Sequence, residues 1–63
     1  MKFETLKKGN KFAFGGELYM KIESHYEGHC KVNAISLLTG ETTFFFNHKE
    51  VDFVKQLTMV YDV

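Results

Sequence analysis

Glycine turns divide this chain into short runs of alternating apolar and polar residues, and this pattern constrains the fold more than any other feature. Gly15-Gly16 separates residues 11–14 from residues 17–23. A Gly-Gly pair between two alternating runs is typical of a tight β-hairpin, because glycine adopts positive φ at little cost. The sequence therefore predicts two antiparallel strands joined directly at this turn.

Successive side chains of a strand point to opposite faces, so each run also predicts which side chains lie together. Phe12 and Phe14 share one face of the first strand. In the second strand we expect an apolar face and a more polar face. They comprise Leu18, Met20 and Ile22 on one side and Tyr19 and Lys21 on the other.

The remaining residues predict further short strands between polar turns. The start of the chain is expected to form a short strand or one helical turn before a turn at Gly9 or Asn10. The register of the strand at 31–38 stays open, since both of its faces are partly apolar. In Phe44-Phe45-Phe46 we expect two rings inside and one outside. The expected order after the hairpin is a loop at 24–30 bending at Gly28, a strand at 31–38, a turn at Thr39-Gly40, a strand at 41–47 and a polar turn at 47–50.

The length and the residue pattern together favour an all-β meander closed into a small barrel. No stretch of ten or more residues holds a 3.6-residue apolar period, and the β-branched and aromatic content of the tail argues against a helix there. The chain has 63 residues and one cysteine, so it forms one domain without an internal disulfide. Five or six short strands are expected, and closure removes the exposed edges of a flat sheet.

Residues 51–63 form the most unusual segment, because apolar side chains occupy almost every odd position. A single strand of that length exceeds what small domains use. Either the chain bends near Lys55-Gln56 into two strands, or residues 55–63 form a C-terminal strand or tail that pairs with another chain. The candidate assembly residues are Leu57, Met59, Tyr61 and Val63.

The charge pattern argues against a protein that reads duplex DNA. The eight cationic side chains are all lysines, and eight acidic residues balance them. Arginine, which supplies the bidentate contact to guanine and phosphate, is absent. We interpret Lys7, Lys8 and Lys11 as a solvated turn. The N-terminus lacks a signal-peptide pattern and no apolar run could span a membrane, so we expect a cytoplasmic protein.

A set of turn and core positions has a recognisable spacing, namely Leu6-x-x-Gly9-x-x-Phe12-x-Phe14-x-Gly16-x-x-Tyr19, Asn33-Ala34-x-x-Leu37-x-Thr39-Gly40-Glu41, Phe46 and Val51-x-Phe53-Val54. This spacing resembles that of small SH3-like barrel proteins of tailed phages, most of which have no assigned function. A looser likeness connects it to the KOW-like domain that opens bacterial elongation factor P, which shares the Leu-x-x-Gly start. The resemblance implies an all-β, SH3-like barrel of five or six strands, and it leaves the tail outside. That factor's lysine-bearing loop has no counterpart here, so its function is not implied.

Two groups of residues could in principle bind a metal or act in catalysis, but both are weak candidates. His25, His29 and Cys30, with His48 further on, have metal-ligand character, but adjacent His29 and Cys30 rarely reach one ion from a strand. We therefore interpret them as loop residues and predict no metal or other cofactor. Cys30 beside His29 also lacks nucleophile-to-base geometry, and we expect no enzymatic activity.

The aromatic content remains, with seven phenylalanines and three tyrosines. Most of the phenylalanines are needed for the core. Tyr19, Tyr26 and one ring of residues 44–46 are candidates to face outwards, where beside Lys21 and Lys31 they could stack bases or hold a nucleotide, and Phe45 is the candidate binding residue of the three. The alternative is that these rings cover the barrel ends or an oligomer contact.

Two functions follow as hypotheses. The first is a non-enzymatic binding module, encoded by a phage or prophage, that docks to a partner protein or assembles with itself through its tail. The second is binding of single-stranded nucleic acid or a nucleotide through the barrel face, including sequestration of a signalling nucleotide against host defence. Neither function involves a membrane.

Overall fold

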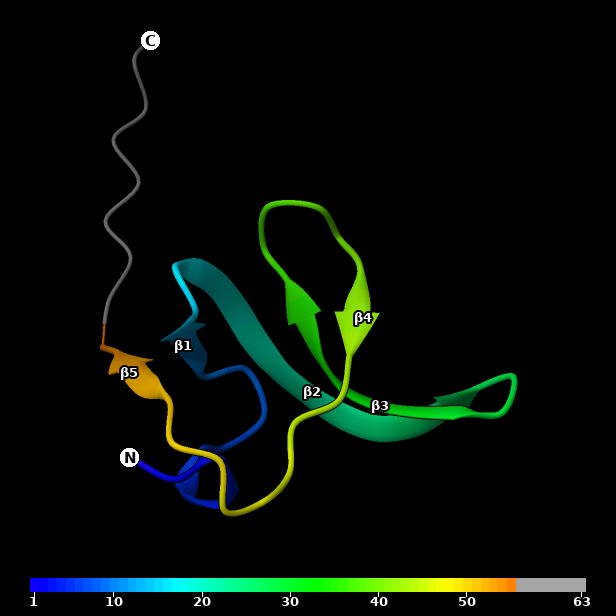
Figure 1. Cartoon of the computed structure of the whole chain (residues 1–63), viewed down its shortest axis with the longest axis horizontal. Helices are drawn as coiled ribbons and strands as arrows, with labels where there is room; N and C mark the ends of the chain where they lie inside the picture. The colour runs from blue at the N-terminus through cyan, green and yellow to red at the C-terminus, as the bar shows by residue number, and fades with distance from the viewer. Residues whose placement is uncertain (56–63) are drawn as a thin grey trace, which may run out of the picture.

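The computed structural model describes residues 1–55, and the predicted assembly residues Leu57, Met59, Tyr61 and Val63 lie outside this range. Within it the protein is a small all-β, barrel-like domain (Figure 1). The strands pair antiparallel in the order β4-β3-β2-β1-β5. No helix of residues 1–55 is long and apolar enough to cross a membrane. The elements are a 3-10 turn η1 (Phe3–Thr5), β1 (Lys11–Phe14), β2 (Glu17–Glu27), β3 (Cys30–Ser36), β4 (Thr42–Thr43) and β5 (Asp52–Val54).

The predicted hairpin at Gly15-Gly16 is confirmed. Both glycines have positive φ, at 60° and 82°, and β1 pairs directly with β2. This register places Phe12 opposite Tyr19 and Phe14 opposite Glu17. Side chains opposite each other in an antiparallel pair lie on the same face, so Tyr19 shares the face of Phe12.

The long strand β2 curves through the whole molecule and joins its two halves (Figure 1). Its first part pairs with β1 and its later part pairs only with β3. The register shifts between Lys21 and His25, so that residues 22–24 of β2 oppose Asn33 alone on β3. Such a bulge bends a strand and increases its twist. The bend lets one sheet wrap around its own core.

Aromatic rings dominate the core. Phe3 and Phe12 are fully buried, and their ring centroids lie 5.5 Å apart in an edge-to-face arrangement. Around them pack Leu6, Ala34, Phe45 and Val51, with Phe14 and Tyr19 partly buried at the margin. The N-terminal segment is held in place by its backbone, because Phe3 N–H donates to Lys49 O at 2.9 Å and Val51 N–H donates to Met1 O at 2.9 Å.

Three predicted boundaries are wrong. Residues 24–30 are not a loop: β2 continues to Glu27 and turns at Gly28, which has φ 66°. The strand predicted at 31–38 spans Cys30–Ser36. The strand predicted at 41–47 is reduced to Thr42–Thr43, because the following backbone leaves β3 and bonds to the side chain of Asn33 instead.

Two predicted orientations are also wrong. Phe45 is buried, whereas Phe44 and Phe46 are exposed, so one ring of the three lies inside and two lie outside. On β2 the face that turns to the core carries Tyr19 and Lys21, while Leu18 on the opposite face is exposed. The reason is the register with β1, which places Tyr19 beside buried Phe12.

Candidate functional site

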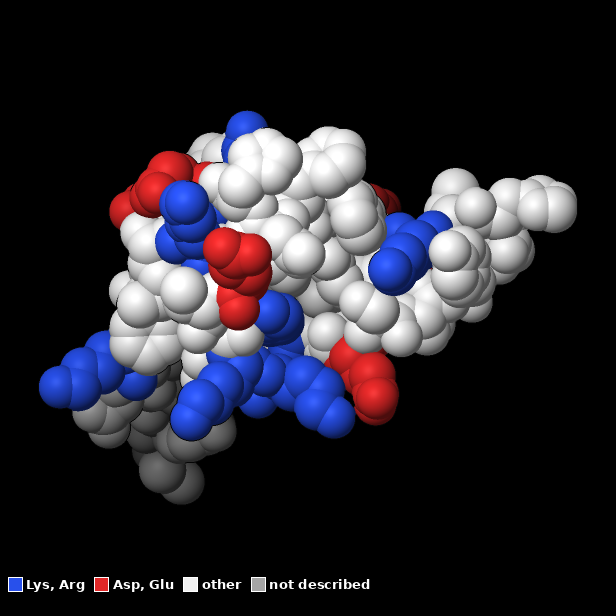
Figure 2. Space-filling view, turned by 90° about the horizontal axis from the view of Figure 1, so that it is seen from below, with Lys and Arg blue, Asp and Glu red and all other residues white. Residues whose placement is uncertain are grey.

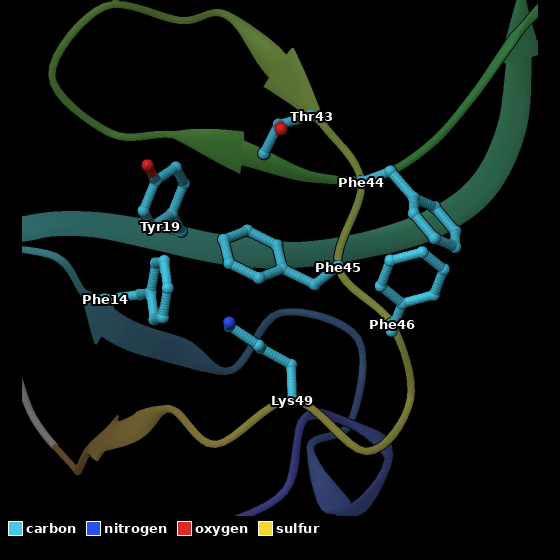
Figure 3. A pocket seen from close by; sticks show the side chains of 7 residues that line it. All are labelled: Phe14, Tyr19, Thr43, Phe44, Phe45, Phe46 and Lys49. Atoms are coloured by element: carbon cyan, nitrogen blue, oxygen red, sulfur yellow. The ribbon is translucent and has the colours of Figure 1, made fainter.

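An open pocket of about 330 Å³ lies where β1, β2 and the segment after β4 meet (Figure 3). We call it the aromatic pocket. Its volume is at the lower end of the range that small-molecule sites occupy. The lining residues are Phe14, Tyr19, Thr43, Phe44, Phe45, Phe46 and Lys49.

Phe45 forms the floor of the aromatic pocket and is held rigidly. Its side chain is 7% exposed, and its ring contacts Phe14 and Tyr19 edge-to-face at centroid distances of 5.4 and 5.1 Å. The buried Asn33 side chain donates from Nδ2 to Phe45 O and accepts from Phe45 N–H, both at 2.8 Å. These paired bonds satisfy backbone groups that no strand partner reaches. The floor is therefore pre-formed.

Tyr19 forms one wall, with its hydroxyl at the pocket margin. Its ring stacks on Phe12 at 5.4 Å, and the hydroxyl donates to Glu17 Oε2 at 3.0 Å. Partial burial raises the pKa of Tyr19 above its ordinary value of 10.0, and the bond to the Glu17 carboxylate raises the pKa further. The hydroxyl is consequently a neutral donor near neutral pH.

The rim presents two aromatic rings to solvent. Phe44 and Phe46 are 40% and 62% exposed, and they meet edge-to-face at 5.2 Å. Phe46 also stacks on the His48 ring at 5.9 Å. Because these rings support one another outside the core, they offer apolar surface without being required to fill the interior.

Lys49 places a positive charge at the rim. Its Nζ lies 4.9 Å from the centroid of the Phe14 ring and points into the pocket region (Figure 3). The turn that carries it closes with a bond from Lys49 N–H to Phe46 O at 3.0 Å. The backbone is thus anchored, and the ammonium group can reach a ligand that lies against the rings.

The predicted binding residues do not form one site. Tyr19 and Phe45 meet in the aromatic pocket, although both were expected to face outwards. Tyr26 and Lys31 oppose each other on the β2–β3 hairpin, where Tyr26 is 68% exposed. Neither of these two lines the aromatic pocket.

Lys21 has a structural position instead of a surface one. Its Nζ donates to Phe3 O at 3.1 Å and to Leu6 O at 2.8 Å, and it lies 4.5 Å from the centroid of the Phe3 ring. The ammonium group therefore caps the carbonyls of the η1 turn at one end of the core. The sequence did not reveal this, because a lysine next to alternating apolar residues is usually solvated.

The histidine and cysteine residues of the hairpin are separated. His25 Nε2 lies 3.1 Å from Glu27 Oε2, and its Nδ1 lies 3.2 Å from Glu23 O. These two acceptors, with the backbone oxygen first, raise the pKa of His25 above its ordinary value of 6.5. Across residues 1–55, no three His, Cys, Asp or Glu side chains gather in a metal-binding arrangement.

Sequence reasoning missed Phe44, Phe46 and Lys49 as lining residues. One available signal was the two-residue turn at Gly15-Gly16, which sets the register and hence assigns Tyr19 to the face of Phe12 and Phe14. No comparable signal existed for the rim, since the bond of Asn33 to Phe45 joins residues that are distant in sequence.

The lysines are a weaker candidate for a site. On the face shown in Figure 2 they gather in the lower middle, and acidic side chains lie beside them. Lys8 Nζ, for example, lies 3.5 Å from Glu23 Oε2. Positive charge that is shared with carboxylates gives less counterion release than an unbroken basic stripe. The aromatic pocket is the better-formed site.

Comparison with known protein families, with curated proteins and with solved structures gives no match for this chain.

Proposed function

We propose that this chain is a non-enzymatic binding module that docks to a partner protein through the aromatic pocket. The observation that carries the proposal is the pair of exposed rings, Phe44 and Phe46, above a pre-formed floor at Phe45. Aromatic side chains dominate binding energy at protein interfaces, and a rigid floor lowers the entropy cost of binding. The pocket is lined mainly by aromatic rings, with Lys49 as the charged side chain among its described lining residues, and a largely apolar lining of this kind suits a binding surface.

The proposal is tested by placing a photo-crosslinking phenylalanine derivative at position 46 and, as a matched control, at position 26. Both side chains are exposed aromatics, but Tyr26 lies on the β2–β3 hairpin. Irradiation in bacterial lysate should give a discrete protein adduct from position 46 that excess unlabelled protein suppresses. Equal adducts from both positions, or adducts with nucleic acid from position 46, would contradict protein docking.

A nucleotide or single-stranded nucleic acid is the second candidate ligand. The observation that favours it is Lys49 beside exposed rings, because a base can stack on a ring while a phosphate meets the cation. Thermal stabilisation by a nucleotide panel, or binding of oligothymidine that weakens with salt, would support this candidate. The adjoining carboxylates of Glu17 and Glu41 weigh against it, since they repel phosphate.

Self-assembly through the tail remains part of the proposal and is tested separately. A chain ending at Lys55 lacks the four predicted assembly residues. If the tail pairs with a second copy, the full chain should be a dimer or larger oligomer in solution, whereas the folded truncated chain should be a monomer. A monomeric mass for both chains would exclude that role.

An origin in a phage or prophage, with action in the cytoplasm, is proposed on the sequence resemblance alone. The gene neighbourhood tests the origin, because adjacent phage genes would support it and housekeeping operons would not.

A further inference from the structure

A second hollow of about 270 Å³ adjoins the aromatic pocket and carries acidic side chains where the aromatic pocket carries a lysine. Tyr19 and Thr43 line both hollows, so the two adjoin, and we call them together the groove. We call the second part the acidic hollow, because it is lined by the carboxylates of Glu17 and Glu41 together with hydroxyl groups of β4 and the preceding turn. The groove therefore runs from Lys49, past the rings, to two acidic side chains.

The charges at both ends are available to a ligand. Among residues 1–55, no carboxylate lies within 4.0 Å of Lys49 Nζ, and no cationic group lies that close to Glu17 or Glu41. Glu17 accepts one bond from the Tyr19 hydroxyl through Oε2. On the β2–β3 hairpin, by contrast, the Glu27 carboxylate already lies against His25 at 3.1 Å.

We infer that the groove takes an extended protein segment in which an apolar side chain lies between an acidic and a basic residue. This inference rests on the proposed docking function. In an extended chain every second side chain points to the same face, so a segment with the pattern acidic-x-apolar-x-basic, read in either direction, presents these three side chains together. The acidic residue meets Lys49, the apolar side chain enters the aromatic pocket and the basic residue meets the acidic hollow.

Electrostatic complementarity selects this partner over two alternatives. A uniformly acidic segment or a nucleic-acid strand gains at Lys49 but meets repulsion at Glu17 and Glu41. A uniformly basic segment gains at the acidic hollow but meets repulsion at Lys49. Opposite charges at the two ends therefore make the groove selective for a segment of mixed charge.

The experiment compares four acetylated and amidated pentapeptides by NMR titration of the isotope-labelled full chain at low salt. They are Glu-Thr-Phe-Thr-Lys, Glu-Thr-Phe-Thr-Glu, Lys-Thr-Phe-Thr-Lys and Ser-Thr-Phe-Thr-Ser. Each complementary charge at an exposed site should tighten binding about two- to fivefold. The mixed-charge peptide should therefore bind tightest, with shifts at Phe14, Tyr19, Phe44 and Phe46, and high salt should remove its advantage.

Reversing the charge at one end provides the sharper test. Lys49→Glu makes both ends of the groove acidic, so the Lys-Thr-Phe-Thr-Lys peptide should become the tightest ligand. The matched control Lys31→Glu changes an exposed lysine of the β2–β3 hairpin and should leave the ranking unchanged. If Lys49→Glu proves unstable, Glu41→Lys combined with Glu17→Gln reverses the other end and should favour Glu-Thr-Phe-Thr-Glu.

The outcomes separate this inference from the docking proposal. If all four peptides bind the aromatic pocket equally, the charge selection is wrong while docking stands. If no peptide shifts the pocket resonances at millimolar concentration and oligothymidine does, both are overturned. A peptide of residues 56–63 that binds more tightly than the mixed-charge peptide would also overturn the inference, because the occupant would then be the tail of this chain.

Discussion

The start and the end of strand β2 differ sharply in burial, although they belong to one continuous strand. At its start, Tyr19 and Lys21 contact the aromatic core and the η1 turn. From Glu23 through Lys31 every residue is exposed, and Tyr26 packs against no core ring. The core end therefore supplies most of the stability and supports the aromatic pocket, whereas the β2–β3 hairpin is held by its backbone ladder and a few surface contacts. Similar residue types thus have different roles at the two ends.

The largest predicted contrast is between two aromatic truncations. Phe45→Ala removes a ring that contacts four others and should lower the free energy of unfolding by about 3–5 kcal/mol. Tyr26→Ala on the hairpin should change it by less than about 0.5 kcal/mol. Urea unfolding followed by circular dichroism measures both, with Phe45→Leu as a milder variant. Equal losses would show that stability is not concentrated at the core end.

A smaller loss in the free energy of unfolding is expected when the Asn33 side chain, which holds the pocket floor, is removed. Asn33→Ala leaves the buried N–H and C=O of Phe45 without partners, which should cost about 2–3 kcal/mol. Asn47→Ala, at an exposed position, serves as the control and should cost less than about 0.5 kcal/mol. A loss at Asn33 no larger than at Asn47 would refute the anchoring role.

Lysine substitutions sharpen the comparison further. Lys21→Met keeps the apolar stem but removes the ammonium group from Phe3 O and Leu6 O, which should cost about 1–2 kcal/mol. Lys31→Met on the hairpin should leave the free energy of unfolding, measured by chemical denaturation, almost unchanged. If Lys21→Met is neutral in stability but weakens ligand binding, the binding role predicted from sequence would be reinstated.

The smallest effect concerns protonation within the hairpin. The pKa of His25 is raised, so its contribution to stability is present below pH 6.5 and is lost as pH rises through the folded-state pKa. The pKa of Glu27 is lowered, first by the Thr42 hydroxyl and then by His25, so its contribution is present above pH 4.5 and is lost as pH falls through the lowered pKa. The stabilising contributions of His25 and Glu27 are therefore both fully present between pH 4.5 and pH 6.5.

NMR titration measures this pair directly, because both groups are exposed and the change in melting temperature should be small. Glu27→Gln should lower the pKa of His25, and Thr42→Val should raise the pKa of Glu27. An unchanged His25 titration in Glu27→Gln would show that the ion pair does not persist in solution.

Turn chemistry made part of this fold predictable. Gly15-Gly16 predicted the first hairpin, and the glycine that bends the β2–β3 connection was also identified, although its strand was not. The aromatic pocket was less predictable. Its floor depends on Asn33 and Phe45, which are twelve positions apart, and its cation depends on a turn fastened to Phe3. Contacts between distant residues leave no local periodic pattern.

The sequence by itself determined an all-β chain with short strands and a tight first hairpin. Only the tertiary structure decided which face of each strand became the interior. Alternation defines two faces but not which of them is covered, and here the pairing of Tyr19 with Phe12 turned the more polar face of β2 inwards. The same packing buried Phe45 and left Phe44 and Phe46 outside, because Asn33 binds the backbone between them.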